Sequence, residues 1–203
     1  MTEAIIQQQL IQSYNNHAEE RDGMEISDWK LRVRSEYLGL LQEAGARTLL
    51  ELGAGPGRDS YFFKNEGLSV TSTDASPEMV RLCRAKGLDA RLMDFRRLEF
   101  PEAVFDGVYA LNCLLHLPKR ELPDVLQEIR RVLKPGGLFF MGVYGGNDSE
   151  GIWEQDHYEP KRFFAMYSDT NLLHAVEEVF RVVRFETIPQ PDGAPHFQSL
   201  VLA

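Results

Sequence analysis

Three glycines at every second position follow an acidic residue in the stretch LLELGAGPGRDSYFF, residues 49–63. The glycines are Gly53, Gly55 and Gly57, and the carboxylate before them is Glu51. Glycine adopts positive φ and lets a ligand approach the backbone without meeting a Cβ atom. A loop of this kind, between an apolar strand and a helix, is typical of nucleoside-binding sites. The alternative is a tight turn without a ligand.

Two further carboxylates end later apolar segments. Asp74 ends LSVTSTD, the place where a carboxylate accepts hydrogen bonds from ribose hydroxyls. Asp94 ends LDARLMD and is followed by Phe95. A carboxylate beside an aromatic ring suits adenine, because the carboxylate accepts the amino hydrogens while the ring packs on the base. The alternative for Asp94 is a simple loop cap, since Asp is common in turns.

The spacing of the glycines bears on which nucleoside is bound. A dinucleotide fingerprint reads Gly-x-Gly-x-x-Gly, whereas here the third glycine comes one residue early and Arg58 occupies the expected place. The carboxylate of Glu51 would repel a pyrophosphate but suits a ligand that carries an amine and a sulfonium. The electrostatics favour S-adenosylmethionine over NAD. An NAD-dependent oxidoreductase stays open as an alternative, because those enzymes share the feature at Asp74.

The elements that position these residues alternate along the chain. The first 45 residues read as helical, with one helix ending near Gly23 and another running from a Ser27 cap to Gly45. Ser76 and Pro77 predict the start of a later helix. Apolar strands alternating with helices predict an α/β protein with a parallel sheet covered on both faces, and the last two strands should pair antiparallel at one edge. The predicted strands span residues 47–52, 68–74, 88–94, 105–112, 138–144, 180–187 and 196–203.

Composition narrows the class of protein. The 203 residues suit one domain, and 22 basic against 31 acidic residues give a formal net charge of −9. A chain this acidic is a poor partner for nucleic acid. Two cysteines, Cys83 and Cys113, predict buried thiols in a reducing compartment and no metal site. The N-terminal stretch lacks the features of a signal peptide, and no run approaches the about 18 apolar residues that cross a bilayer, so we expect a cytoplasmic protein without membrane contact.

Over residues 47–143 the chain resembles the class I S-adenosylmethionine-dependent methyltransferases of the small-molecule type. The resemblance rests on LLELGAGPGRDS, VTSTDASPEMV, RLMDFRRLEF, FDGVYALNCLLHLP and EIRRVLKPGGLFFMGV, in that order. It implies a Rossmann-like, doubly wound seven-stranded sheet of order 3-2-1-4-5-7-6, with strand 7 antiparallel. We predict a single methyltransferase domain over residues 1–203, divided into a helical lid (1–45), a cofactor-binding core (46–143) and a substrate-side segment with edge strands (144–203).

The resemblance also assigns roles around the cofactor S-adenosylmethionine and its product S-adenosylhomocysteine. Glu51 and the glycines would surround the methionine part, and Asp74 would hold the ribose. The remaining residues would line the adenine, bind the base or lie beside the methionine moiety. The cofactor-binding residues that we predict are Glu51, Gly53, Ala54, Gly55, Gly57, Arg58, Asp74, Ala75, Met79, Asp94, Phe95 and Asn112.

Methyl transfer is an in-line displacement, in which the protein mainly aligns the acceptor with the methyl carbon. A base is needed only where the acceptor must lose a proton. The candidates are His116, Tyr14 and His157, with Tyr158 as a fourth. His116 is alternatively a helix-start histidine bonded to the backbone. The sequence ALNCLLHLP lacks the motifs of base-amino and cytosine-carbon methylating enzymes, and Cys113 is expected to be packed.

The acceptor side is expected in two segments outside the motifs. Residues 144–169 read as a long run without regular structure, which is usually functional in a compact domain. Its glycines at 145 and 146 suggest movement, and residues 161–164 either contact the acceptor or dock the loop. The helix that carries Tyr14 is a lid over the cofactor or a plain amphipathic helix. We predict a small-molecule acceptor, neutral or cationic, and a monomer or homodimer. The alternative function is a non-catalytic protein that senses cofactor or serves a partner.

Overall fold

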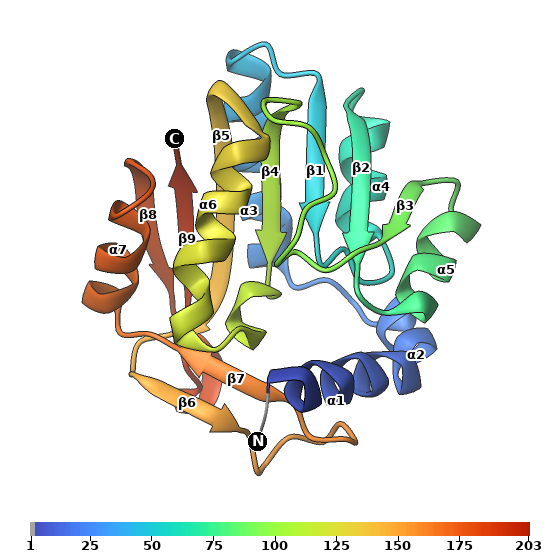
Figure 1. Cartoon of the computed structure of the whole chain (residues 1–203), viewed down its shortest axis with the longest axis vertical. Coiled ribbons are helices and arrows are strands. Elements are labelled where there is room, and N and C mark those ends of the chain that lie inside the picture. Colours follow the sequence, from blue (N-terminus) through green and yellow to red (C-terminus); the bar gives the residue numbers. More distant parts are fainter. Residues whose placement is uncertain (1–2) are drawn as a thin grey trace.

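One seven-stranded sheet organises the computed structural model, which describes residues 3–203 (Figure 1). Its order is β3-β2-β1-β4-β5-β9-β8, and β9 runs antiparallel to both β5 and β8 while β1 to β5 run parallel. This confirms the predicted order and the antiparallel last strand. Met1 and Thr2, which the predicted domain includes, lie outside the described residues. The strands of this sheet are β1 (Thr48–Leu52), β2 (Ser69–Asp74), β3 (Asp89–Leu92), β4 (Phe105–Leu111), β5 (Leu133–Gly145), β8 (Val182–Ile188) and β9 (His196–Leu202).

Helices cover both faces of the sheet. Helices α6 (Leu122–Val132) and α7 (Asp169–Glu177) pack on one face, and α3 (Asp28–Glu43) and α4 (Arg58–Asn65) pack on the other. Side chains alternate along a strand, so consecutive leucines of β1 enter the two opposite cores. This double burial explains why the central strands β1, β4 and β5 are mostly apolar, whereas β2 and β3, nearer the edge of the sheet, carry several polar residues.

Helix α5 (Pro77–Ala85) packs against β2 and β3 and begins as the sequence predicts. The hydroxyl of Ser76 accepts a hydrogen bond from the backbone N–H of Met79 at 3.2 Å, and Pro77 occupies the first turn. An N-cap and a proline at the first helical position satisfy or avoid donors that have no partner within the helix. The start of α5 fixes the position of the chain directly after Asp74.

A layer of short elements lies across the carboxyl ends of the strands, and we call it the roof. It consists of α1 (Glu3–Asn16), α2 (Ala18–Gly23), β6 (Ser149–Ile152), β7 (Phe163–Met166) and the loop between β6 and β7, residues 153–162. Figure 1 shows α1 and the β6–β7 pair beneath the arrowheads of β1 and β4. The predicted helix that ends near Gly23 is interrupted at His17, so it forms two helices.

The segment 144–169 differs from the expected run without regular structure. Strands β6 and β7 pair antiparallel, with Ser149 opposite Met166 and Ile152 opposite Phe163. Each strand has only four residues, too few for a clear period-2 pattern. Ile6 of α1 packs with Phe163 and Ala165, which joins the two parts of the roof.

Gly145 and Gly146 allow close packing, whereas the sequence suggested movement. A Cβ atom on Gly145 would lie 2.1 Å from Oε1 of Gln198, and one on Gly146 would lie 2.6 Å from the ring of His196. Gly146 also has a φ of +104°, which L side chains rarely adopt. These glycines let β9 approach the end of β5.

Candidate functional site

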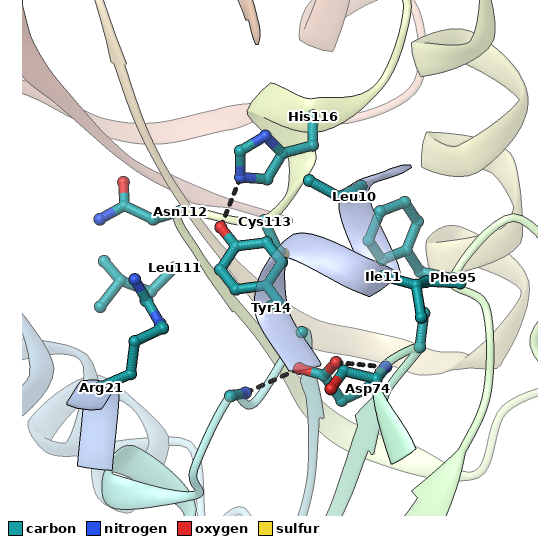
Figure 2. A pocket seen from close by; sticks show the side chains of 14 residues that line it. Leu10, Ile11, Tyr14, Arg21, Asp74, Phe95, Leu111, Asn112, Cys113 and His116 are labelled. Carbon is teal, nitrogen blue, oxygen red and sulfur yellow. Dashed lines mark hydrogen bonds between the residues drawn. The ribbon is translucent and has the colours of Figure 1, made fainter. Parts of the chain in front are cut away.

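A cavity lies between the roof and the carboxyl ends of β1, β2 and β4 (Figure 2). Three side chains of α1 reach into it, and their spacing places them on one face of that helix. The predicted lid helix therefore covers this cavity. The lining residues are Leu10, Ile11, Tyr14, Arg21, Gly53, Gly55, Asp74, Ala75, Ser76, Phe95, Leu111, Asn112, Cys113 and His116.

The three glycines of the loop all have positive φ, at +58°, +55° and +82° for Gly53, Gly55 and Gly57. Their surroundings differ. A Cβ atom on Gly53 would lie 2.4 Å from Cβ of Cys113, and one on Gly57 would lie 2.6 Å from Cδ1 of Leu88. A Cβ atom on Gly55 would meet no atom within 4 Å. Two glycines therefore serve packing, and Gly55 is the one that faces open space.

Asp74 ends β2 at the wall of this cavity. Its Oδ2 accepts a hydrogen bond from the backbone N–H of Gly55 at 2.8 Å, and its Oδ1 accepts one from the N–H of Ser76 at 2.8 Å (Figure 2). Burial raises the pKa of the carboxyl group, and the backbone hydrogen bonds act in the opposite direction. Each carboxylate oxygen can accept a further bond. The side chain is therefore held in place with acceptor capacity facing the cavity.

Glu51 is buried near the end of β1 and lines another cavity next to the first, which we call the third cavity. The hydroxyl of Ser60 donates to Glu51, and that hydroxyl also lies 2.6 Å from the hydroxyl of Ser72. Burial, followed by the charge of Asp59, raises the pKa of Glu51 well above its usual value. A cationic ligand group here would favour the charged carboxylate.

Asn112 lies where β4 ends and lines the first and third cavities. It also lines a larger, second cavity that adjoins the first on the roof side. Its φ is +55°, an uncommon value for a residue other than glycine. Its Oδ1 atom is buried and has no hydrogen-bond partner among the described residues. Buried polar atoms are normally paired, so this oxygen marks a position for a ligand donor.

The side chains of Tyr14 and His116 meet between the first and second cavities (Figure 2). Nδ1 of His116 lies 2.7 Å from the carbonyl oxygen of Phe163, and Nε2 lies 2.7 Å from the hydroxyl of Tyr14. A carbonyl only accepts, so Nδ1 carries the hydrogen and Nε2 accepts from Tyr14. Burial lowers the pKa of His116 to about 3, so the ring is neutral at pH 7.

The second, larger cavity adjoins the first on the roof side. It shares four residues with the first cavity. Its other walls come from the roof, α3, the segment after β4, the end of β5 and the loop before β9. The lining residues are Tyr14, Arg21, Lys30, Asn112, Leu115, His116, Tyr144, Trp153, Arg162, Phe164, Met166, Gln190, Pro191, Ala194 and Pro195.

Arg162 is fixed by a buried ion pair within the roof. Its Nε and Nη2 donate to the two carboxylate oxygens of Asp156 at 2.8 Å and 2.9 Å, and its Nη1 donates to the hydroxyl of Tyr14 at 3.2 Å. The side chain of Asp156 is fully buried. The same arginine therefore holds the roof together and orients Tyr14.

Several predicted site residues lie elsewhere. Met79 is buried among Ala18 and Leu82. Asp94 does not line the three cavities; its Oδ2 accepts from Nε2 of Gln7 at 2.5 Å, and its Oδ1 accepts from the backbone N–H of Arg96 at 2.9 Å. The second bond is the loop cap that the sequence left open.

His157, a candidate base, is not brought to the site. Its side chain is 72 % exposed and lies beside Asp156 and Tyr158. By contrast, Ala75 and Phe95 line the first cavity, and Ala54 and Arg58 line the third.

Sequence reasoning missed Arg21 and Lys30, which line the second and third cavities. Both lie in charged stretches that resemble any solvated helix, so no local pattern distinguishes them. Leu10 and Ile11 were also missed, although their spacing with Tyr14 could have indicated a shared face. Within residues 3–203, no group of three or more His, Cys, Asp or Glu side chains could hold a metal ion. No helix in that part of the chain is both long and apolar enough to cross a membrane.

Comparison with known proteins finds one matching family and many relatives. Residues 49–137 match a family described as "Methyltransferase domain". The chain is 32% identical over 143 residues to a sterol 24-C-methyltransferase of Gibberella zeae. The matched region covers 66% of this chain and 36% of that protein. It is 32% identical over 119 residues to a ubiquinone biosynthesis O-methyltransferase of Xanthomonas oryzae, which covers 55% of this chain and 48% of that protein. The chain thus spans between a third and a half of the length of these relatives.

A solved structure extends the likeness to nearly the whole chain. The 1,6-didemethyltoxoflavin-N1-methyltransferase of Burkholderia thailandensis, determined with 1,6-didemethyltoxoflavin and S-adenosylhomocysteine bound, superposes with a TM-score of 0.72. The identity is 22%, and the match covers 95% of this chain and 86% of the other. At this identity the comparison concerns the fold, which includes the N-terminal helices and the edge strands.

Proposed function

The chain belongs to the class I S-adenosylmethionine-dependent methyltransferases, and from this premise we propose that it transfers a methyl group from S-adenosylmethionine to a small molecule. The observation that carries the proposal is the pairing of Asp74 with the open backbone of Gly55 at adjacent strand ends. A carboxylate fixed by backbone donors suits a ribose, and a glycine without neighbours leaves the room that a nucleoside needs.

The residues of the first and third cavities fit this cofactor. The carboxylate of Asp74 accepts hydrogen bonds from the ribose hydroxyls, and Ile11 and Phe95 supply apolar walls for the base. Glu51 faces the amine of the methionine part, where a cation stabilises its charged form. Arg58 lines the same cavity and provides a counter-charge for the carboxylate of the cofactor.

S-adenosylmethionine supplies a reactive methyl group on a positively charged sulfur, and its transfer is an in-line displacement. The protein contributes by aligning the acceptor, which can provide much of the acceleration. Asn112 and Tyr14 lie at the junction of the first and second cavities and position the acceptor there. His116 acts through Tyr14: it accepts the hydroxyl hydrogen and fixes the direction of that side chain.

His116 is a positioning residue in this mechanism. Its pKa of about 3 is far below neutrality, and its Nε2 is occupied by Tyr14. A general base works best when its pKa lies near the operating pH. His116 therefore helps to orient the acceptor by fixing Tyr14, and it does not remove a proton from the acceptor.

Calorimetry on the full chain tests the cofactor assignment. S-adenosylmethionine and S-adenosylhomocysteine are expected to bind at least about tenfold more tightly than NAD. Tighter binding of NAD would contradict the proposal. A screen of small molecules with cofactor labelled in the methyl group then separates an enzyme from a cofactor sensor, because only an enzyme moves the label to an acceptor.

A further inference from the structure

The lining of the second cavity is cationic, although the chain as a whole is acidic. Arg21, Lys30 and Arg162 all contribute to it, and none of its lining residues, among those the structure describes, is Asp or Glu. The charge of Arg162 is balanced by Asp156. Arg21 and Lys30 form no ion pair with any described residue. The carboxylates whose charges act on them, Asp74 on Arg21 and Asp59 on Lys30, belong to the walls of the first and third cavities and not of the second.

Arg21 is oriented by aromatic side chains and keeps unused donors. Its Nη1 donates to the hydroxyl of Tyr158 at 3.3 Å, and its guanidinium lies 5.1 Å from the centre of the Tyr14 ring. Its Nε is buried and has no hydrogen-bond partner in the described part of the chain. A buried donor on a charged group is costly to leave unpaired, and an anion would satisfy it.

Lys30 lies close enough to two arginines to be affected by their charge. Burial, followed by the charges of Arg21 and Arg58, lowers the pKa of its ammonium group. Like charges held together in a partly buried place repel one another unless an anion is bound between them. Arg58 lines the third cavity but not the second, so it faces the methionine end of the cofactor.

The rest of the second cavity is mainly apolar. Aromatic side chains come from β5 and from the roof, and prolines come from the loop before β9. Small-ligand sites combine such walls with a few polar groups that fix orientation. The apolar members include Tyr144, Trp153, Phe164, Met166, Pro191 and Pro195.

We propose that the methyl acceptor is an anion: a small molecule with an apolar body and an oxyanion that is ionised at neutral pH, such as a carboxylate or phosphonate, held by Arg21 and Lys30 in the second cavity. This inference rests on the proposed function. It differs from the neutral or cationic acceptor that net charge suggested, because the local lining, and not the total of −9, sets the field that a ligand meets.

An ionised acceptor also agrees with the lack of a suitable base. His116 is neutral, and its free nitrogen is used by Tyr14. When an oxyanion attacks, the oxygen–carbon bond forms as the carbon–sulfur bond breaks, the sulfur keeps the electron pair, and no proton has to leave. Arg21 lines all three cavities, so it lies at the junction where this transfer takes place.

Matched pairs of small ligands test the inference. Calorimetry first establishes that the full chain binds S-adenosylhomocysteine; if it does not, the proposed function fails and the inference fails with it. Benzoate, naphthoate and phenylphosphonate are then titrated into the saturated protein, each beside its neutral amide. We expect the best acid to bind at least about tenfold more tightly than its amide. Equal binding of acid and amide would overturn the inference while leaving the proposed function intact.

Two variants test which side chains cause the preference for acids over amides. Arg21→Gln is expected to reduce the acid-to-amide ratio by about tenfold or more, and Lys30→Gln to reduce it less. Arg47→Gln is the control, because Arg47 is exposed just before β1, at the amino ends of the strands and away from the cavities. The ratio is insensitive to a general loss of folded protein. A preference that survives Arg21→Gln, or falls equally in Arg47→Gln, would contradict the inference. So would acids that bind only in competition with S-adenosylhomocysteine, because the cations would then serve the carboxylate of the cofactor.

Discussion

The ends of β1, β2 and β4, which form the floor of the cleft, are held by backbone hydrogen bonds, whereas the two parts of the roof, α1 and the β6–β7 pair with its loop, are joined to each other by side chains. In the floor, the N–H groups of Gly55 and Ser76 fix Asp74. In the roof, Arg162 alone connects Asp156 and Tyr14. Backbone contacts follow from the fold itself, while a side-chain network depends on each member. The floor is therefore suited to a constant ligand and the roof to a variable one.

The same contrast appears in the electrostatics. Carboxylates predominate at the floor, where Glu51 and Asp74 have raised pKa values because they are buried. Cations predominate under the roof, where Arg21 and Lys30 lack carboxylate partners among the described residues. A ligand that is cationic at one end and meets an anionic acceptor at the other would match both regions. The predictions below test how separable the two regions are.

The largest effect is expected at the floor. Asp74→Ala would remove the two charge-assisted hydrogen bonds that we propose to the ribose, each worth about 1.5–3 kcal/mol, so affinity for S-adenosylhomocysteine should fall at least about 100-fold. Asp94→Ala is the matched control and should cost less than about tenfold, because Asp94 is already bonded to Gln7 and Arg96. Calorimetry measures both. Equal or reversed losses would show that Asp94, and not Asp74, is the main polar contact.

The next effect belongs to the roof. Asp156→Asn leaves Arg162 buried without a counter-charge, and the loss of one partner of a buried pair costs about 3 kcal/mol. Hydrogen exchange should become faster in β7 and α1 while β1 and β4 remain protected. The control is Glu154→Gln, whose pair with Lys161 is exposed and worth less than about 1 kcal/mol. Unchanged exchange in β7 would mean that packing alone holds the roof.

A pH dependence follows from His116. Its pKa is about 3 in the folded protein and about 6.5 when unfolded, so the folded state disfavours its protonation. The stability from this group is fully present above pH 6.5 and is lost as pH falls toward 3, with a slope of about 1.4 kcal/mol per pH unit. Glu51, whose pKa is raised, contributes a slope of the opposite sign in this range, so the test is the difference between two proteins. In urea unfolding between pH 6 and 4.5, stability should fall more steeply with decreasing pH in the unmodified protein than in His116→Gln. The window avoids Asp156, whose pKa of about 2 becomes important only at lower pH. Identical slopes in the two proteins would contradict the assignment.

The difference between floor and roof also explains what the sequence could predict. Floor residues follow strands directly, so Gly55, Asp74 and Asn112 could be placed from local patterns and strand order. Roof residues meet only through tertiary packing: Tyr14 and Arg162 are far apart in the chain, yet their polar atoms lie 3.2 Å apart. No periodicity encodes that contact.

Two errors share a physical cause. The exposed position of His157, which lies in the loop between β6 and β7, and the ordered β6–β7 pair both depend on tertiary packing, and strands of four residues are too short to be recognised from their pattern. Net charge is a similar case, since the sum of −9 over the chain says nothing of the cationic lining of one cavity, and the proposed anionic acceptor is argued from that lining. Local sequence therefore predicts the floor, whose residues are placed by the backbone. The three-dimensional structure is needed for the roof, whose residues meet through side chains.

The smallest predicted effect concerns a direct hydrogen bond between α1 and the loop that follows β3. Nε2 of Gln7 on α1 donates to Oδ2 of Asp94, and the two residues belong to distant parts of the chain. Gln7→Ala and Asp94→Ala should each loosen α1, and the double variant should be less damaging than their sum by about 0.5–1.5 kcal/mol, the value of one hydrogen bond. Hydrogen exchange of α1, with and without S-adenosylhomocysteine, measures this coupling. If Asp94 instead binds the adenine, Asp94→Ala will reduce cofactor affinity while Gln7→Ala will not, and the two changes will be additive. The double variant therefore decides whether Asp94 belongs to the floor, as the resemblance implies, or anchors the roof.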